Sequence, residues 1–101
     1  MKPYKSYQAS LIRSLKNPQN AAHYLNAAFE ENDLALCLLA LSNVARAHGM
    51  SALARKVNLH RVSLHKMLSK KGNPEFQSII KIAKASGLKL QFQPQNLRRA
   101  A

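Results

Sequence analysis

Four histidines and one cysteine are the side chains in this sequence best suited to metal binding or nucleophilic catalysis. Zinc sites bring such residues together at short recurring spacings, such as i,i+3 or i,i+4. His60 and His65 are five residues apart, and His23, His48 and Cys37 fall in other segments. No acidic residue lies close to these histidines in the chain to orient one as a base. We therefore predict no metal, no cofactor and no enzymatic activity.

Positive charge is the second chemical feature of the sequence. There are 16 Lys and Arg residues against 4 Asp and Glu, a formal net charge of +12. Residues 1–33 carry four basic and three acidic side chains, whereas residues 34–101 carry twelve basic side chains and Glu75. Surface helices usually mix both signs, so an acid-free stretch from Leu34 to Pro74 indicates a polyanionic partner. Double-stranded DNA is the leading candidate, and the alternative is that the cations coat a solvated surface.

Length and composition limit the class of protein. A chain of 101 residues that is 47% hydrophobic can bury the core of one small domain. A single cysteine excludes a disulfide scaffold. The longest uncharged stretch, Leu34–Ala45, is too short to cross a bilayer, and no apolar signal region follows the N-terminus. We expect an intracellular protein without a membrane or small-molecule partner.

Within the acid-free stretch, residues 50–69 match the spacing of a helix-turn-helix motif. The motif needs a small residue where the second helix crosses the first, and Ala54 meets that need. It needs a turn residue that tolerates the left-handed conformation, and Asn58 stands there. Five flanking positions must be apolar, and they hold Leu53, Val57, Leu59, Leu64 and Met67. An ordinary helical hairpin is the alternative interpretation.

In such a motif, the second helix enters the major groove with its first residues toward the base edges. The candidates for base reading are His60, Arg61, Val62, Ser63, His65 and Lys66. Arg61 is the strongest of them, because a guanidinium can bond O6 and N7 of guanine together. The candidates for phosphate contacts are Ser51, Arg55, Lys56, Lys70 and Lys71.

Capping residues and apolar spacing predict an all-α fold that positions these residues on five helices. The predicted helices run from Pro18 to about Glu31, from Leu34 to about His48, from a cap at Ser51 to about Val57, from Arg61 to about Ser69, and from a cap at Asn73 to Gly87. Each predicted helix has one apolar face that we expect to be buried. Residues on these faces include Phe29, Leu34, Leu38, Leu39, Leu41, Val44, Ala45 and Phe76.

The two ends of the chain flank a predicted DNA-binding domain of residues 17–94. Residues 1–16 are predicted to form an arm or short helix with an apolar face, which either docks on the domain or serves as a separable arm that binds a partner. Residues 88–92 alternate apolar and polar side chains, which predicts a short strand or extended segment. That segment either packs on the last helix or pairs with a second protomer or with the sheet edge of a partner protein. Residues 95–101 form a flexible tail.

Several stretches together carry a resemblance to a known family. They are Leu11-Ile12, Leu15-Lys16-Asn17-Pro18, Ala22-x-Tyr24-Leu25-Asn26-Ala27-Ala28, Leu38-Leu39-Ala40-Leu41, the predicted motif from Ser51, Ser63-Leu64-x-x-Met67-Leu68-Ser69, Lys71-Gly72-Asn73-Pro74 and Gly87-Leu88. From Tyr7 to Pro94 the chain resembles the addiction-module antidote (HigA-like antitoxin) family of Xre-type, lambda-repressor-like DNA-binding proteins. Family members usually carry acidic residues in places where this chain has Asn17, Gln19, Asn20 and His60.

The resemblance implies a bacterial or phage-derived, cytoplasmic and nucleoid-associated antitoxin. Such a protein neutralises a small basic toxin of the RelE/ParE (HigB) type and represses its own operon as a homodimer. Glu30, Glu31, Asp33 and apolar surface are then the expected toxin contacts, and the arm of residues 1–16 and the segment 88–92 are further candidates for binding the toxin. The alternatives are a stand-alone prophage-type Xre regulator without a toxin and, less favoured, a small basic ribonuclease. The ribonuclease is considered because the cognate toxins are themselves small and cationic. It is less favoured because the resemblance implies that those toxins contain a substantial sheet, whereas this chain offers one short strand.

Overall fold

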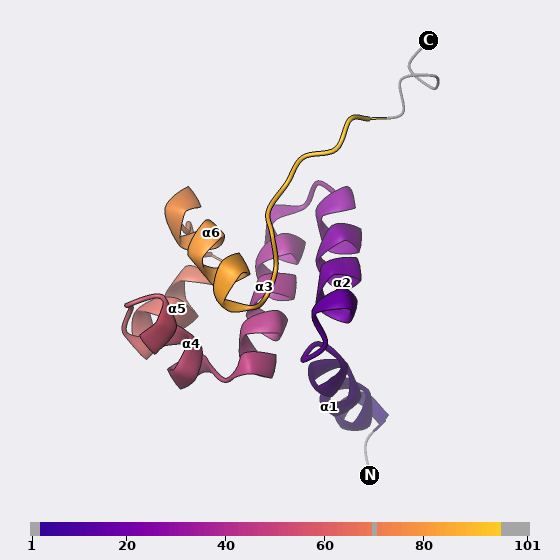
Figure 1. Ribbon diagram of the computed structural model, residues 1–101. Coiled ribbons are helices and arrows are strands. Elements are labelled where there is room, and N and C mark those ends of the chain that lie inside the picture. The colour runs from indigo at the N-terminus through magenta and orange to yellow at the C-terminus, as the bar shows by residue number, and fades with distance from the viewer. Residues whose placement is uncertain (1–2, 70, 96–101) are drawn as a thin grey trace.

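The computed structural model describes residues 3–69 and 71–95, and all regular secondary structure in this part of the chain is helical (Figure 1). Its six helices are α1 (Pro3–Ser14), α2 (Pro18–Glu30), α3 (Leu34–His48), α4 (Met50–Lys56), α5 (Arg61–Met67) and α6 (Phe76–Ala85). The predicted all-α class is confirmed. For residues 88–92 the extended segment, and not the strand, is the alternative that the structure shows, because they have no strand pairing among the described residues.

Two of the predicted helix starts are made by the expected caps. The side chain of Asn17 accepts a hydrogen bond from the backbone N–H of Gln19 at 2.8 Å, and Pro18 follows at the first helical position. The carboxylate of Asp33 accepts one from the backbone N–H of Leu36 at 3.3 Å. These caps fix where α2 and α3 begin, and with them the direction of the two longest helices.

Two other predicted caps are wrong. Gly49 ends α3 and also caps α4, which therefore begins at Met50 rather than after a cap at Ser51. Its φ of +92° suits glycine, and its carbonyl already accepts the N–H of Leu53 at 2.9 Å. Helix α6 begins at Phe76 after Glu75, because the N–H of Ile79 bonds to the carbonyl of Glu75 and not to an earlier residue.

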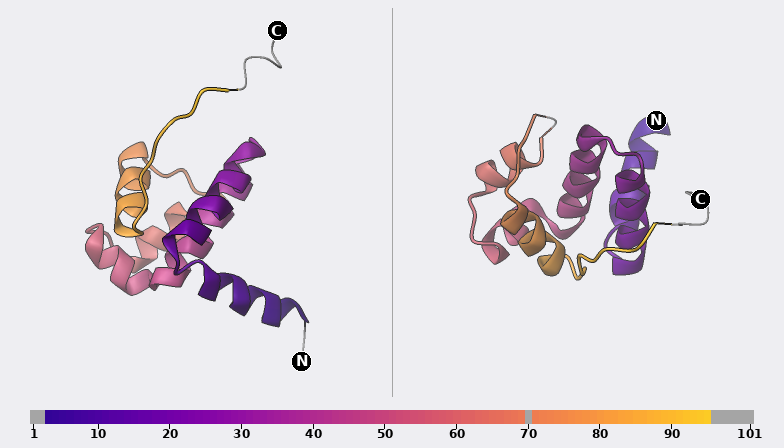
Figure 2. Two further views of the ribbon diagram at one scale, coloured as in Figure 1. Left: turned by 45° about the vertical axis from the view of Figure 1, so that its right-hand side comes forward. Right: turned by 90° about the horizontal axis from the view of Figure 1, so that it is seen from above.

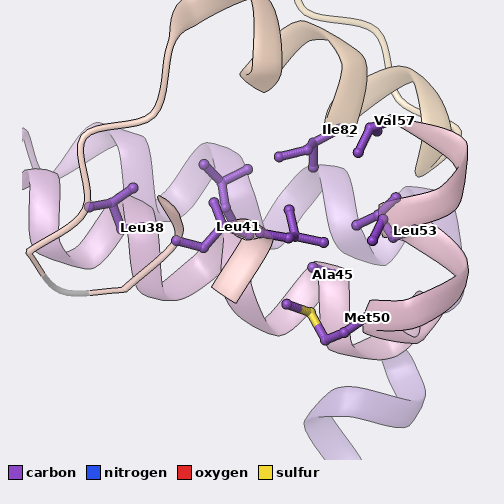
Figure 3. Close-up of a cluster of buried hydrophobic side chains, with 10 residues drawn as sticks. Leu38, Leu41, Ala45, Met50, Leu53, Val57 and Ile82 are labelled. Atoms are coloured by element: carbon purple, nitrogen blue, oxygen red, sulfur yellow. The ribbon is translucent and has the colours of Figure 1, made fainter. Parts of the chain in front are cut away.

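The buried side chains form two clusters on either side of α3. The first joins α3 to α4, α5 and α6, and includes Leu38, Leu41, Ala45, Met50, Leu53, Val57, Leu64 and Ile82 (Figure 3). The second joins α3 to α1, α2 and the α1–α2 turn, and includes Leu15, Ala21, Val44 and Ala47. Helix α3 is therefore the central helix of the domain, as its apolar stripe predicted.

Four side chains predicted to be buried are exposed instead. They are Phe29 (45%), Leu34 (65%), Leu39 (53%) and Phe76 (63%). Phe29, Leu34 and Phe76 lie at or next to helix ends, beyond the reach of the packed neighbours. Leu39 lies on a third face of α3, since the two clusters occupy the other faces. An apolar stripe in sequence thus overestimates burial where no second element covers it.

Helix α1 attaches to the rest of the domain partly through a polar network. The buried Asn43 on α3 donates from its side-chain amide to the hydroxyl of Tyr24 on α2 at 2.8 Å. Gln8 on α1 donates to the side-chain oxygen of Asn43 at 3.3 Å. Figure 2 shows α1 leaving the foot of α2 at a steep angle, so this network and the second cluster hold its orientation.

Among the described residues, no single helix has the length and apolar character to cross a membrane. Helices α3 and α4 meet that criterion only as a pair bent by 96°. The bend falls at Gly49, and both helices contribute side chains to the first buried cluster.

Candidate nucleic-acid interface

Helices α4 and α5 pack against each other across a turn at Asn58. Asn58 has a φ of +60°, in the left-handed region that asparagine tolerates better than most residues. The N–H of Leu59 donates to the carbonyl of Ala54 at 2.8 Å, and the N–H of Asn58 to that of Arg55 at 3.2 Å. These two bonds are the Schellman arrangement, which ends α4 and redirects the chain into α5.

The side chains that hold this pair lie in the first core cluster. Leu53, Ala54, Val57 and Leu64 are buried, with exposed fractions of 4% or less. Leu59 and Met67 are half-buried and pack against the same cluster. The apolar positions that the motif requires therefore all face the core. As a result, the outer side of α5 keeps a fixed orientation relative to α3.

The candidate base-reading residues lie on the exposed surface of α5 and at the residue just before it. His60, Arg61, Val62, Ser63, His65 and Lys66 are all exposed. Arg61 is the first residue of α5, and the preceding His60 makes no capping hydrogen bond with its side chain. Val62, an apolar side chain, is 69% exposed. This face therefore offers hydrogen-bond donors and one apolar side chain together.

The candidate phosphate-binding residues flank that face. Ser51, Arg55 and Lys56 are exposed on α4, and Lys71 is exposed in the turn that follows α5. Lys70 lies outside the described residues. In that turn, a Cβ atom at Gly72 would collide with the backbone carbonyl of Met67, so the close return of the chain requires glycine there.

None of the four acidic residues lies on α4 or α5. Glu30, Glu31 and Asp33 are exposed around the α2–α3 turn, and the fourth acid, Glu75, precedes α6. In Figure 1 the α2–α3 turn is at the upper ends of these two helices, and α4 and α5 lie at the lower left. Asp33 nevertheless shares a groove with Leu68 and Ser69, the two residues that follow α5, so the separation of charge applies to the start of α5 and not to its end.

Apolar side chains gather beside these acids, which the sequence analysis did not foresee. Leu34 and Leu39 are exposed there, and Leu39 lines a groove of about 570 Å³ between α3 and the chain after α5. The groove is lined by Asp33, Ala35, Leu36, Leu39, Ser42, Leu68 and Ser69. We refer to this surface, with Phe29, Glu30, Glu31 and Leu34, as the acidic apolar end. The sequence contained one indication of this surface. Helix α3 has more apolar residues than one buried stripe can hold, so some of them must face outward.

Cys37 lies on α3 near this end and is half-buried. Burial, with a smaller contribution from the negative charge of Asp33, raises the pKa of its thiol. Its sulfur lies 3.9 Å from the backbone carbonyl of Ala28, close enough for a weak hydrogen bond. The thiol is therefore protonated at neutral pH and acts as a packing group. Among the described residues, no three His, Cys, Asp or Glu side chains come together as a metal site.

The fold and the interface define a small, basic, all-helical protein with an exposed cationic helix pair. The sequence model of one family, described as "probable addiction module antidote protein", matches residues 5–94. An uncharacterized protein of Haemophilus influenzae is 46% identical over 77 residues, which cover 76% of this chain and 77% of that protein. No solved structure matches. The chain belongs to the addiction module antidote family, which suggests a regulatory protein rather than an enzyme.

Proposed function

We propose that this protein is the antitoxin of a toxin–antitoxin operon and represses that operon by binding its DNA as a homodimer. In this proposal it acts in the bacterial cytoplasm, on the nucleoid. Family membership supports the antitoxin role. The observation that carries DNA binding is the α4–α5 pair, whose apolar residues are held in the core while its outer face is exposed and lacks acidic residues.

The α4–α5 pair acts as a helix-turn-helix in this proposal, with α5 in the major groove. Arg61 at the start of α5 bonds a guanine, and Val62 contacts a thymine methyl group. His60, Ser63, His65 and Lys66 surround these two residues and reach neighbouring base edges or phosphates. The phosphate contacts come from Ser51, Arg55, Lys56, Lys70 and Lys71, which fix the register of α5 without reading sequence.

Binding to the protein's own upstream DNA tests this function. Fluorescence anisotropy would compare wild-type protein on a duplex from the region upstream of its gene with a random duplex of equal length. We expect specific binding at least about 1,000-fold tighter than random binding. The logarithm of affinity should fall with the logarithm of salt concentration, by close to one unit of slope for each phosphate neutralised. Equal affinity for both duplexes would contradict sequence-specific repression.

The acidic apolar end fits the other half of the proposal, a contact with a toxin of RelE/ParE (HigB) type. Three of the chain's four acids meet exposed apolar side chains there, on a protein whose net charge is otherwise strongly positive. A small basic toxin would find both opposite charge and an apolar groove at this end. The groove reaches Leu68 and Ser69, which follow α5, so the toxin would lie beside the end of α5 and leave its first turn free for DNA.

A positive charge introduced into the groove tests this contact. The chain would be coexpressed with the product of the reading frame next to its gene, and the affinity of the pair measured by calorimetry. Leu39→Lys should weaken the complex at least about 10-fold, because it places a cation in an apolar contact facing a basic protein. Phe76→Lys is the matched control, since Phe76 is similarly exposed on α6.

The outcomes of this experiment separate the alternatives. Equal loss from both substitutions would contradict the assignment of the acidic apolar end. If wild-type protein and the neighbouring product form no complex, the stand-alone Xre regulator becomes the better description. RNA cleavage by the purified protein alone would instead favour the ribonuclease.

A further inference from the structure

Residues 88–95 form an extended segment that is attached to the domain at its first residue. The N–H of Leu88 donates to the carbonyl of Ala83 at 2.8 Å, and its side chain packs against the second core cluster. Residues 89–95 are all exposed, and their backbone groups make no hydrogen bond to another described backbone group. Figures 1 and 2 show the segment, in yellow, running past α3 and out beyond the helices.

The apolar side chains of this segment share one face. Leu88, Leu90 and Phe92 alternate with polar residues, and alternate residues of an extended chain point to the same side. Leu90 is 43% exposed and Phe92 is 91% exposed, which makes Phe92 the most exposed large apolar side chain among the described residues. A single copy therefore leaves both an apolar stripe and a row of backbone donors and acceptors without partners. A strand from another chain would satisfy both.

We propose that the occupant is a second copy of this protein, paired antiparallel through residues 89–93 about a two-fold axis at Gln91. In this register Leu90 lies opposite the partner's Phe92. By the two-fold symmetry, Phe92 lies opposite the partner's Leu90 in the same way. Lys89, the only charged residue in 88–95, lies opposite an uncharged glutamine, so like charges do not meet. The register is thus self-complementary, as a two-fold interface requires.

The limits of the paired stretch follow from the residues on either side. The N–H of Leu88 is already used to end α6, and Pro94 has no N–H to donate. Because Leu88 faces the second core cluster, Leu90 and the partner's Phe92 on the same side would pack toward the domain. The role of this dimer rests on the proposed function. The dimer would present two α4–α5 pairs to an operator that has two-fold symmetry.

Analytical ultracentrifugation of the full-length protein tests the pairing. We expect wild-type protein to be a dimer and Phe92→Asp to dissociate at least about 100-fold more readily, because a buried aromatic contact becomes a buried charge. Phe76→Asp is the matched control, because it makes the same change at an exposed phenylalanine on α6 and should leave the dimer intact. A monomeric wild-type protein, or a Phe92→Asp variant that stays dimeric, would overturn the proposal.

Cross-linking tests the register in a Cys37→Ala background. Gln91→Cys should form an intermolecular disulfide under mild oxidation, since residues directly opposite in a pair have Cβ atoms about 4.5–5.5 Å apart. Gln93→Cys should not, because that residue would lie about 13 Å from its own copy. Cross-linking through residue 93 but not residue 91 would contradict the register.

The same variants keep this proposal separate from DNA binding itself. Phe92→Asp should retain salt-sensitive binding to random duplex, because its α4–α5 pair is intact, while losing operator affinity. If Phe92→Asp remains dimeric and yet Arg61→Ala loses operator binding, the strand pairing fails and the DNA-binding function stands. If Phe92→Asp is monomeric and Arg61→Ala binds the operator normally, the pairing stands and the assignment of α5 fails.

Discussion

Replacing Leu64 by alanine should lower the free energy of unfolding by about 2–5 kcal/mol. Leu64 is completely buried and is the residue through which α5 enters the first core cluster. Alanine would leave a cavity among side chains from α3, α4 and α6, because the surrounding helices can close only part of the space. Since a domain of this size is stable by roughly 5–15 kcal/mol, this single change would remove a large share of the total.

Urea denaturation followed by circular dichroism measures this effect, and Val62→Ala is its control. Val62 lies two residues earlier on the same helix but is 69% exposed, so its truncation should change the free energy of unfolding by no more than about 0.5 kcal/mol. Comparable losses from the two substitutions would mean that α5 is not anchored through Leu64. The α4–α5 pair would then lack the rigid support that the proposed interface needs.

Arg61→Ala should weaken binding to the operator by about 1–3 kcal/mol, which is roughly 5- to 150-fold, and relax the preference at one base pair. The reason is that Arg61 is exposed at the first position of α5, where a side chain can reach the edge of a guanine. Its affinity for random duplex should fall much less, since a base contact contributes little there. Anisotropy titrations on both duplexes measure the two effects.

Lys56→Ala is the comparison for the arginine variant. Lys56 is exposed at the end of α4 and is assigned a phosphate contact, so its loss should weaken operator and random duplex alike. The substitution should also reduce, by close to one unit, the slope of the logarithm of affinity against the logarithm of salt concentration. If Arg61→Ala and Lys56→Ala reduce both affinities equally, α5 is not the helix that reads the bases.

Much of the helical framework could be predicted from local rules. Asn17 and Asp33 cap helices because their side chains reach free backbone N–H groups, and that reach depends only on near neighbours in the chain. The positive φ of Asn58 and the burial of Leu64 likewise follow from spacing within twenty residues. The all-helical class was predictable for the same reason.

The remaining differences come from contacts between segments distant in the chain. Leu39 has the spacing of a core residue, but it is exposed because no helix covers that face of α3. Ser51 has the chemistry of a cap, but Gly49 already joins α3 to α4. The acidic apolar end combines residues from α2, α3 and the chain after α5, which only the packing brings together. Sequence patterns give the properties of each face but not which faces are covered.

The central claim is that the first turn of α5 lies against bases in the operator. Amide chemical shifts of the protein, recorded by nuclear magnetic resonance with and without the upstream duplex, test this claim most directly. We predict that the largest changes fall on residues 60–66, with smaller ones on Ser51, Arg55 and Lys56, and little change near Leu34 and Leu39. Largest changes at the α2–α3 turn, with α5 unaffected, would contradict the claim.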